Sequence, residues 1–137
     1  MTREQIEHVN QSWQSIVLMG DTAIAMFYRR LHDIDPSTHQ LFSDTDMHAQ
    51  RLKFMDTFGL CVRSLNDLEE CRPMLEQLGR RHAALGVKEE HYDSVREALL
   101  TTIESGLGQI LDRHAKEAWT VAYERITQPM RSAGYPN

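Results

Sequence analysis

Apolar residues recur every three or four positions along most of this chain, the spacing that one buried face of an α-helix requires. The pattern predicts six long helices joined by short turns, and no segment alternates in the way a β-strand does. The expected helices cover approximately residues 3–18, 22–34, 47–65, 72–84, 89–104 and 110–130. On the first of them the expected buried face consists of Ile6, Val9, Trp13, Ile16 and Val17. We therefore expect an all-α fold in which residues 1–137 form a single domain.

Residues that start or stop helices mark several of these boundaries. Thr2, with Gln5 three residues later, has the pattern of a capping box at the first helix. Asp35-Pro36 ends the second helix, because the residue before a proline avoids helical dihedral angles. Gly20 and Gly86 supply the residue at which a helix commonly stops.

The C-terminal part carries weaker signals. Residues 105–108 indicate a loose connection before the last helix. Pro129 should mark the fraying end of that helix, since proline cannot donate a backbone hydrogen bond. The tail, residues 132–137, is expected to be irregular.

The composition excludes several classes of function. The net charge of −5 argues against nucleic-acid binding through a basic surface. No apolar run approaches the roughly 20 residues that span a bilayer, and the N-terminus lacks an apolar signal segment, so we expect a cytoplasmic protein. Cys61 and Cys71 are ten residues apart and form no close-spaced metal motif. Cys61 lies in an apolar run, which favours a buried, reduced thiol.

One histidine stands out because it follows leucines on a helix face. Leu75, Leu78, His82 and Leu85 are separated by steps of three and four residues, so His82 is expected to point inward with them. A histidine in such a place is either a core residue hydrogen-bonded to protein or a metal ligand. On the pattern alone, the core residue is the commoner case.

Several short motifs occur in a characteristic order, namely Phe27-Tyr28, Asp35-Pro36 with Leu41-Phe42, Leu78-Gly79-Arg80-Arg81-His82, Gly86-Val87 with His91-Tyr92, and Ala98-Leu99-Leu100. In their order and spacing they resemble those of bacterial globins. The chain is similar to single-domain haemoglobins related to the globin domain of flavohaemoglobins, with neuroglobin-like features. The resemblance runs from Trp13 to about Met130. It implies a globin fold of about six main helices around a haem pocket.

The resemblance also implies a cofactor, haem b, and a role for individual residues. His82 matches the proximal ligand of the haem iron. Tyr28, Gln50 and Phe54 match the residues on the distal side, where a gas would bind. The other positions that the resemblance places at the haem are Phe42, Lys53, Arg81, Leu85, Val87, Tyr92 and Val95.

The chemistry of these residue types suits that assignment, although each has a simpler explanation. A neutral imidazole is a strong ligand for haem iron when its other nitrogen is held by a hydrogen bond. Tyr28 and Gln50 could donate an O–H and an N–H to bound O₂. Equally, Tyr28 could be a core aromatic, Gln50 a solvated helix residue and Phe54 plain core packing.

The remaining histidines are weaker candidates for the iron. His48 precedes Gln50 by two residues, which turns it roughly 200° around the helix, so it should face away. The others show no partner spacing and are expected at the surface: His8, His32, His39, His91 and His114. One departure from the flavohaemoglobin pattern is Gly134, which stands where those proteins carry a late glutamate.

Three functions are compatible with the sequence. The first is a haem protein that binds O₂, NO, CO or sulfide reversibly, as a monomer or weak dimer. The same site could convert NO to nitrate if an external reductase supplied electrons, so enzyme activity stays open. The second is a haem-based gas-sensor module that signals to a partner or output domain. The third is a haem-free interaction domain, which leaves the pairing of His82 with Tyr28 and Gln50 unexplained.

Overall fold

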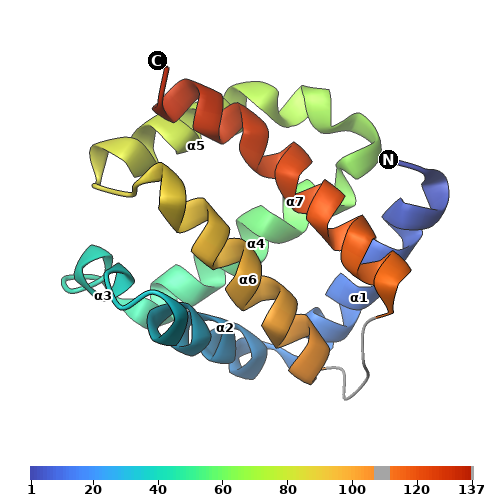
Figure 1. The fold of residues 1–137 in the computed structure, drawn as a ribbon, viewed down its shortest axis with the longest axis horizontal. Helices are drawn as coiled ribbons and strands as arrows, with labels where there is room; N and C mark the ends of the chain where they lie inside the picture. The colour runs from blue at the N-terminus through green and yellow to red at the C-terminus, as the bar shows by residue number, and fades with distance from the viewer. Residues whose placement is uncertain (107–111, 137) are drawn as a thin grey trace.

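The computed structural model describes residues 1–106 and 112–136. Within them the chain forms six long α-helices, one short α-helix and one 3₁₀-helix, and no strand (Figure 1). This confirms the all-α architecture and the number of long helices that the hydrophobic pattern predicts. The long helices are α1 (Arg3–Met19), α2 (Asp21–Ile34), α4 (Met47–Arg63), α5 (Arg72–Ala84), α6 (Glu89–Gly106) and α7 (Arg113–Gly134). The short ones are α3 (Thr38–Leu41) and the 3₁₀-helix η1 (Leu65–Cys71).

The helix ends follow their sequence signals. Thr2 and Gln5 form the predicted capping box at α1, with both reciprocal hydrogen bonds present. Gly20 and Gly86 adopt φ angles of 68° and 100°, in the left-handed region that favours glycine, and the chain turns at both. Asp46 caps α4 by accepting hydrogen bonds from two backbone N–H groups of its first turn.

Two predictions about the C-terminal part are wrong. Pro129 lies inside α7, which continues to Gly134, so only the last residues of the tail are irregular. Helical backbone also includes residues 105 and 106, which belong to α6 rather than to a loose connection. The rest of that predicted connection, and the predicted helix start at residue 110, lie outside the described residues. In the described part α7 begins at Arg113, after the cap residue Asp112.

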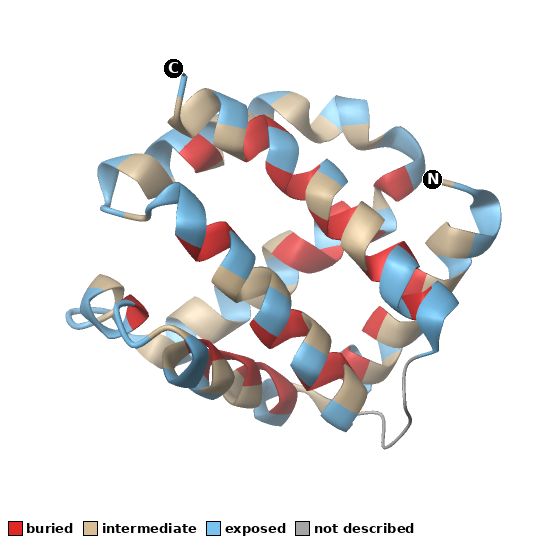
Figure 2. Cartoon of the chain, viewed as in Figure 1, coloured by how far each residue is buried: buried red, intermediate tan, exposed pale blue. Residues whose placement is uncertain are grey.

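The core is built where the buried faces of these helices meet (Figure 2). The most extensive helix contacts join α5 to α7, α2 to α6 and α1 to α7. Val9, Trp13 and Ile16 of α1 are buried as predicted. Val17 is 37% exposed, so the buried face of α1 is narrower than predicted. Cys61 is a buried free thiol, also as predicted.

The backbones of α5 and α7 approach unusually closely at two glycines. A Cβ atom added to Gly79 would overlap the backbone of Met130, including its carbonyl oxygen. A Cβ atom added to Gly134 would lie 2.8 Å from the carbonyl oxygen of Gly79. Only glycine therefore fits at these points, and the contact holds the C-terminal half of α5 against α7.

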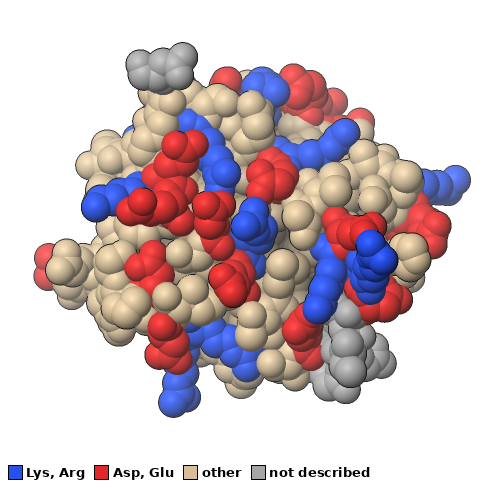
Figure 3. Space-filling view, in the orientation of Figure 1, with Lys and Arg blue, Asp and Glu red and all other residues tan. Residues whose placement is uncertain are grey.

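Charged residues of both signs are interspersed on the face of the molecule shown in Figure 3. Several form ion pairs between helices, including Arg96 with Glu124 at 2.9 Å and Arg131 with Asp93 at 2.9 Å. Exposed pairs of this kind contribute only about 0–1 kcal/mol each. Among the described residues, no helix combines the length and the apolar character needed to cross a bilayer.

The glycine contact gives a test of the packing. Gly79→Ala should lower the free energy of unfolding by about 1–3 kcal/mol, because the added methyl group must push two backbones apart. The higher helix propensity of alanine, worth about 1 kcal/mol, acts in the opposite direction. Denaturant unfolding measures the balance. Arg80→Ala, at the exposed neighbouring position, is the control and should change stability by less than about 0.5 kcal/mol. A Gly79→Ala protein as stable as the original would contradict the close approach.

Candidate functional site

Two of the predicted distal residues meet between α2 and α4. Tyr28 is 5% exposed, and its hydroxyl oxygen accepts a hydrogen bond of 3.1 Å from the Nε2 of Gln50. Because the oxygen is the acceptor in this bond, the phenolic proton is left to be donated elsewhere. Burial raises the pKa of Tyr28 to about 12, so the phenol keeps its proton at neutral pH.

Aromatic rings surround this pair. The ring of Tyr28 meets Phe42 and Phe54 edge-on, with centroid distances of 5.4 Å and 6.0 Å. Phe54 in turn stacks on Phe27 at 4.7 Å and on Phe58 at 5.4 Å. The hydroxyl of Tyr28 and the amide of Gln50 are thus the polar groups of a largely apolar region formed by α2, α4 and the end of α3.

His82 lies in the last turns of α5 and is partly buried. Its Nδ1 lies 2.8 Å from the carbonyl oxygen of Leu78, one turn earlier. A carbonyl oxygen only accepts, so Nδ1 carries the proton and Nε2 keeps its lone pair. Burial lowers the pKa of His82 and so favours the neutral imidazole that a metal requires. The hydrogen bond to Leu78 partly offsets this effect.

Tyr92, on α6, is buried, and its hydroxyl has no hydrogen-bond partner among the described residues. The guanidinium of Arg131 lies over the ring of Tyr92, 5.1 Å from its centroid. The backbone oxygen of Tyr92 accepts a 2.5 Å hydrogen bond from the hydroxyl of Tyr123. Burial raises the pKa of Tyr92 to about 12. The resemblance to flavohaemoglobins would place a glutamate at Gly134, but the carbonyl of Gly79 leaves no room for a side chain there.

The segment that follows His82 connects its helix to the rest of the site. The backbone N–H of Val87 donates to the carbonyl oxygen of His82 at 3.0 Å, and the hydroxyl of Tyr135 donates to the carbonyl oxygen of Val87. A Cβ atom on Gly86 would lie 3.8 Å from the side chain of Leu41, so this corner touches α3.

Other predicted residues are more exposed than expected or lie at the edge of the site. Leu85 is 73% exposed, so its predicted inward placement is wrong. Leu85 is the cap residue that follows Ala84, the last residue of α5, so it lies beyond the buried face of that helix. Lys53 and Arg81 are exposed, while Val87 and Val95 are partly buried and pack against the core. Their contacts with a cofactor stay predictions.

The histidines do not all lie where the sequence indicated. His48, in the first turn of α4, is exposed, in agreement with its predicted direction. His39 and His114 are exposed as predicted. His91, expected at the surface, is only 5% exposed, and that prediction is wrong. Its ring nitrogens are bonded to other residues of the chain, and spacing alone could not show these partners because one of them is distant in sequence. His32 is also less exposed than predicted, because the turn at Asp35-Pro36 brings Thr38 to within 2.7 Å of its Nδ1.

Comparisons with known proteins support the fold described above. A family model described as Globin matches residues 25–130. A flavohemoprotein of Bacillus subtilis is 26% identical over 125 residues, which cover 90% of this chain but 31% of that protein. A neuroglobin of Tetraodon nigroviridis is 27% identical over 137 aligned residues, covering 90% of this chain and 86% of that one. A solved bacterial globin from Campylobacter jejuni superimposes with a TM-score of 0.84 and 25% identity, covering 98% of this chain and 97% of that chain.

The two buried tyrosines provide a matched pair of substitutions. Tyr92→Phe should leave the free energy of unfolding unchanged or raise it by about 1 kcal/mol, because the hydroxyl it removes is buried and has no partner in the described part of the chain. Tyr123→Phe should lower it by about 1 kcal/mol, since it removes the hydrogen bond to Tyr92. Denaturant unfolding of both haem-free variants makes the comparison. Equal losses in the two would show that the hydroxyl of Tyr92 is satisfied.

Proposed function

The chain belongs to the globin family, and we propose that it binds haem b through His82 and holds a small gas molecule, with O₂ the main ligand, on the side of Tyr28. The observation that carries this proposal is the hydrogen bond from the Nδ1 of His82 to Leu78. It fixes the tautomer, orients the ring and leaves Nε2 as a ligand for iron. Haem binding is a property of the family, whereas haem b and the choice of ligand are our inference.

The other residues fit the same cofactor. A porphyrin is flat and apolar except at its propionates, and Phe42, Phe54 and Val87 offer apolar contacts of the kind that it requires. Lys53 and Arg81 are exposed cations, available to propionates at the haem edge. Exposure of Lys53 and Arg81 means that these pairs would add only about 0–1 kcal/mol each to haem affinity.

When bound, haem would supply an iron atom that can bind O₂, NO or CO. The contribution of Tyr28 is a hydrogen bond to the polar ligand O₂, from a proton that Gln50 leaves free by donating to the same oxygen. Hydrogen bonds that involve charged groups are worth about 1.5–3 kcal/mol. CO carries less charge and gains less from the same donor. Phe42 and Phe54 keep water away from this side.

The exposed position of His48 supports an iron atom without an internal distal ligand. His48 also lies in the first turn of α4, where its backbone N–H donates to the cap residue Asp46. We therefore propose that the ferrous form is mainly five-coordinate before it binds gas. A six-coordinate, low-spin ferrous absorption spectrum would contradict this.

We also propose that the same site supports the conversion of NO to nitrate, in which NO, O₂ and one electron combine to give NO₃⁻. The flavohemoprotein relative supports a site that works together with a reductase. This chain matches 31% of that protein, and we propose that an external reductase supplies the electron. Nitrate formation from NO with a reductase present would support turnover, and its absence would leave binding or sensing.

The role of His82 can be tested by replacing the ligand with a free one. His82→Gly should lose the Soret absorption band after reconstitution with haem, and added imidazole should restore it by entering the vacated space. His114→Gly removes an exposed histidine and is the control, for which the band should persist. If His82→Gly bound haem as the original protein does, without imidazole, His82 would not be the ligand.

The role of Tyr28 can be tested by comparing two gases in one variant. Tyr28→Phe removes the hydroxyl but keeps the ring and its packing against Phe42 and Phe54. Release of O₂ should become roughly ten- to hundredfold faster, the factor that about 1.5–3 kcal/mol represents. Release of CO, measured by ligand displacement in the same protein, should change much less. Equal acceleration for both gases would show that Tyr28 shapes the site without donating.

A further inference from the structure

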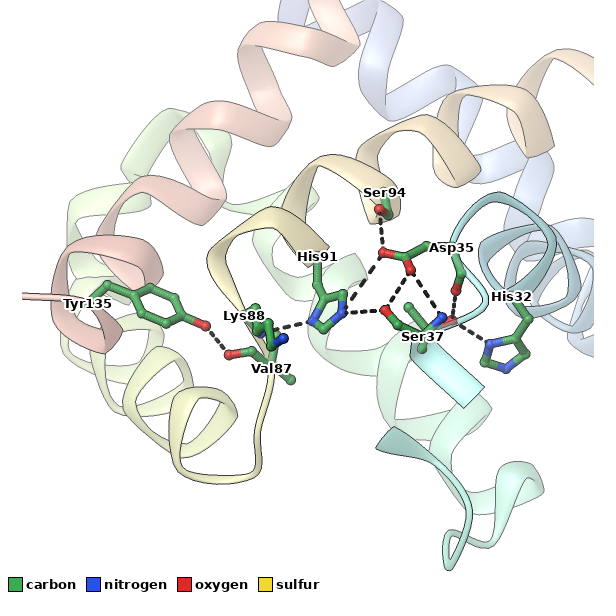
Figure 4. A network of polar contacts seen from close by, with 9 residues as sticks. His32, Asp35, Ser37, Val87, Lys88, His91, Ser94 and Tyr135 are labelled. Atoms are coloured by element: carbon green, nitrogen blue, oxygen red, sulfur yellow. Dashed lines mark hydrogen bonds and ion pairs between the residues drawn. The ribbon is translucent and has the colours of Figure 1, made fainter. Parts of the chain in front are cut away.

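His91 is the buried member of a polar cluster outside the residues that would touch haem or gas (Figure 4), and its partners Asp35 and Ser37 are partly buried and exposed, respectively. Its Nδ1 accepts a 2.9 Å hydrogen bond from the backbone N–H of Lys88. Its Nε2 lies 3.0 Å from the hydroxyl of Ser37 and 3.9 Å from a carboxylate oxygen of Asp35. His91 is thus in contact with two segments that are more than 50 residues apart.

The hydrogen bonds assign every proton in this cluster. A backbone N–H can only donate, so the Nδ1 of His91 is unprotonated and the ring proton is on Nε2. That proton is donated to the oxygen of Ser37, whose own O–H is donated to Asp35 at 2.6 Å. Ser94 donates to the second oxygen of the same carboxylate at 3.0 Å. The bond from Ser37, more than any other, holds the pKa of Asp35 below its usual value, so the acceptor at the end of the chain is ionised.

The cluster connects the two corners that flank the candidate haem site. Asp35 and Ser37 form the corner between α2, which carries Tyr28, and α3. Lys88 belongs to the corner between α5, which carries His82, and α6. The preceding residue, Val87, donates to the carbonyl oxygen of His82 at 3.0 Å. Figure 4 shows this chain of contacts running from His32 beside the first corner to Tyr135 beside the second.

His91 occupies the third position of its helix, which a glutamate or glutamine fills in a capping box. Because α6 begins at Glu89, Lys88 is its N-cap and His91 its third residue. In a capping box, the side chain of that third residue accepts a hydrogen bond from the N-cap N–H. Unlike glutamine, histidine can lose this ability by protonation, since Nδ1–H would then face the N–H of Lys88.

Protonation of His91 would therefore affect its two connections differently. The bond to Lys88 would be lost, and a positive charge near a helix N-terminus is unfavourable. The connection to Ser37 and Asp35 would persist, because Nε2 remains a donor and the carboxylate of Asp35 favours the cation. Other titratable or charged groups around the cluster are Lys88, Glu89 and Glu90 at the start of α6. His32 on α2 is a further one, since its Nδ1 bonds to Thr38, which donates to the backbone oxygen of Asp35.

We propose that His91 is a positioning residue that fastens the corner after His82 to the corner after the Tyr28 helix, and that its protonation releases the His82 corner. Acid would then alter the seating of His82, and with it gas binding, while haem stays bound. This inference rests on the proposed function for its effect on gas binding, but the hydrogen-bond arrangement stands on the structure alone.

The arrangement can be tested in the haem-free chain. Nitrogen NMR of the imidazole should find the proton of His91 on Nε2 at about pH 8. As the pH is lowered, hydrogen exchange at the amide of Lys88 should accelerate in step with the protonation of His91 that the ring-nitrogen signals report. Ser37→Ala should keep the exchange effect, because it leaves the bond to Lys88 in place. A proton found on Nδ1, or an amide of Lys88 whose exchange does not respond beyond the intrinsic pH dependence of exchange, would overturn the proposal.

The effect on the site can be tested in the haem-loaded chain. Between about pH 8 and about pH 5, the original protein should show a reversible shift in the iron–histidine stretching frequency and a change of about two- to tenfold in CO association rate. His91→Gln can retain the N-cap hydrogen bond but cannot titrate, so it should show neither change. His114→Gln, at an exposed site, should behave as the original. A His91→Gln protein with the full pH response would overturn the proposal.

The two sets of measurements separate two kinds of failure. If no variant, nor the original chain, takes up haem, the proposed function fails, while the NMR result still decides whether His91 fastens the two corners. If haem binds and the amide of Lys88 responds to pH, but the iron–histidine frequency does not, the corner is released without affecting His82 and the positioning role is wrong.

Discussion

The contact between the backbones of α5 and α7 at Gly79 and Met130 is the constraint on which the site depends. It fixes α5 by its backbone, so the helix that carries His82 cannot shift in the way that a helix held only by flexible side chains could. The same contact explains why Gly134 has no side chain, since the carbonyl of Gly79 occupies that space. It also accounts for the continuation of α7 past Pro129, because packing against α5 compensates for one missing backbone hydrogen bond.

The two sides of the candidate site follow one chemical rule. In each, a hydrogen bond within the protein occupies one atom of a side chain and leaves a defined atom free. The carbonyl oxygen of Leu78 accepts a hydrogen bond from the Nδ1–H of His82, which leaves a lone pair on Nε2. Gln50 donates to the hydroxyl oxygen of Tyr28, which leaves the phenolic proton of Tyr28 free to be donated. One free group is a Lewis base suited to a metal, and the other is a donor suited to a polar ligand, so the pair supports both halves of the proposed function.

Much of this could be predicted from the sequence, because it depends on local periodicity. The six long helices, the capping box at Thr2 and the inward direction of His82 all follow from spacing within a few turns. The predictions that failed depend on contacts between distant segments or on where a helix ends. Pro129 stays helical because of α5, His91 is buried because of Ser37, and Leu85 is exposed because α5 stops there. Gly79 could be identified as part of a family motif, but not as the point where two backbones meet.

Gly134 bears on which haem chemistry this chain favours. A carboxylate beside Tyr92 would draw its hydroxyl proton and make the region next to His82 more negative, which favours activation of peroxide-like ligands. Here the hydroxyl of Tyr92 has no partner among the described residues, and its pKa is raised to about 12, so it stays neutral. The cation of Arg131 lies over the ring of the same tyrosine. A neutral imidazole held only by a backbone carbonyl would push little electron density onto a metal, which supports the proposed reversible binding of a gas.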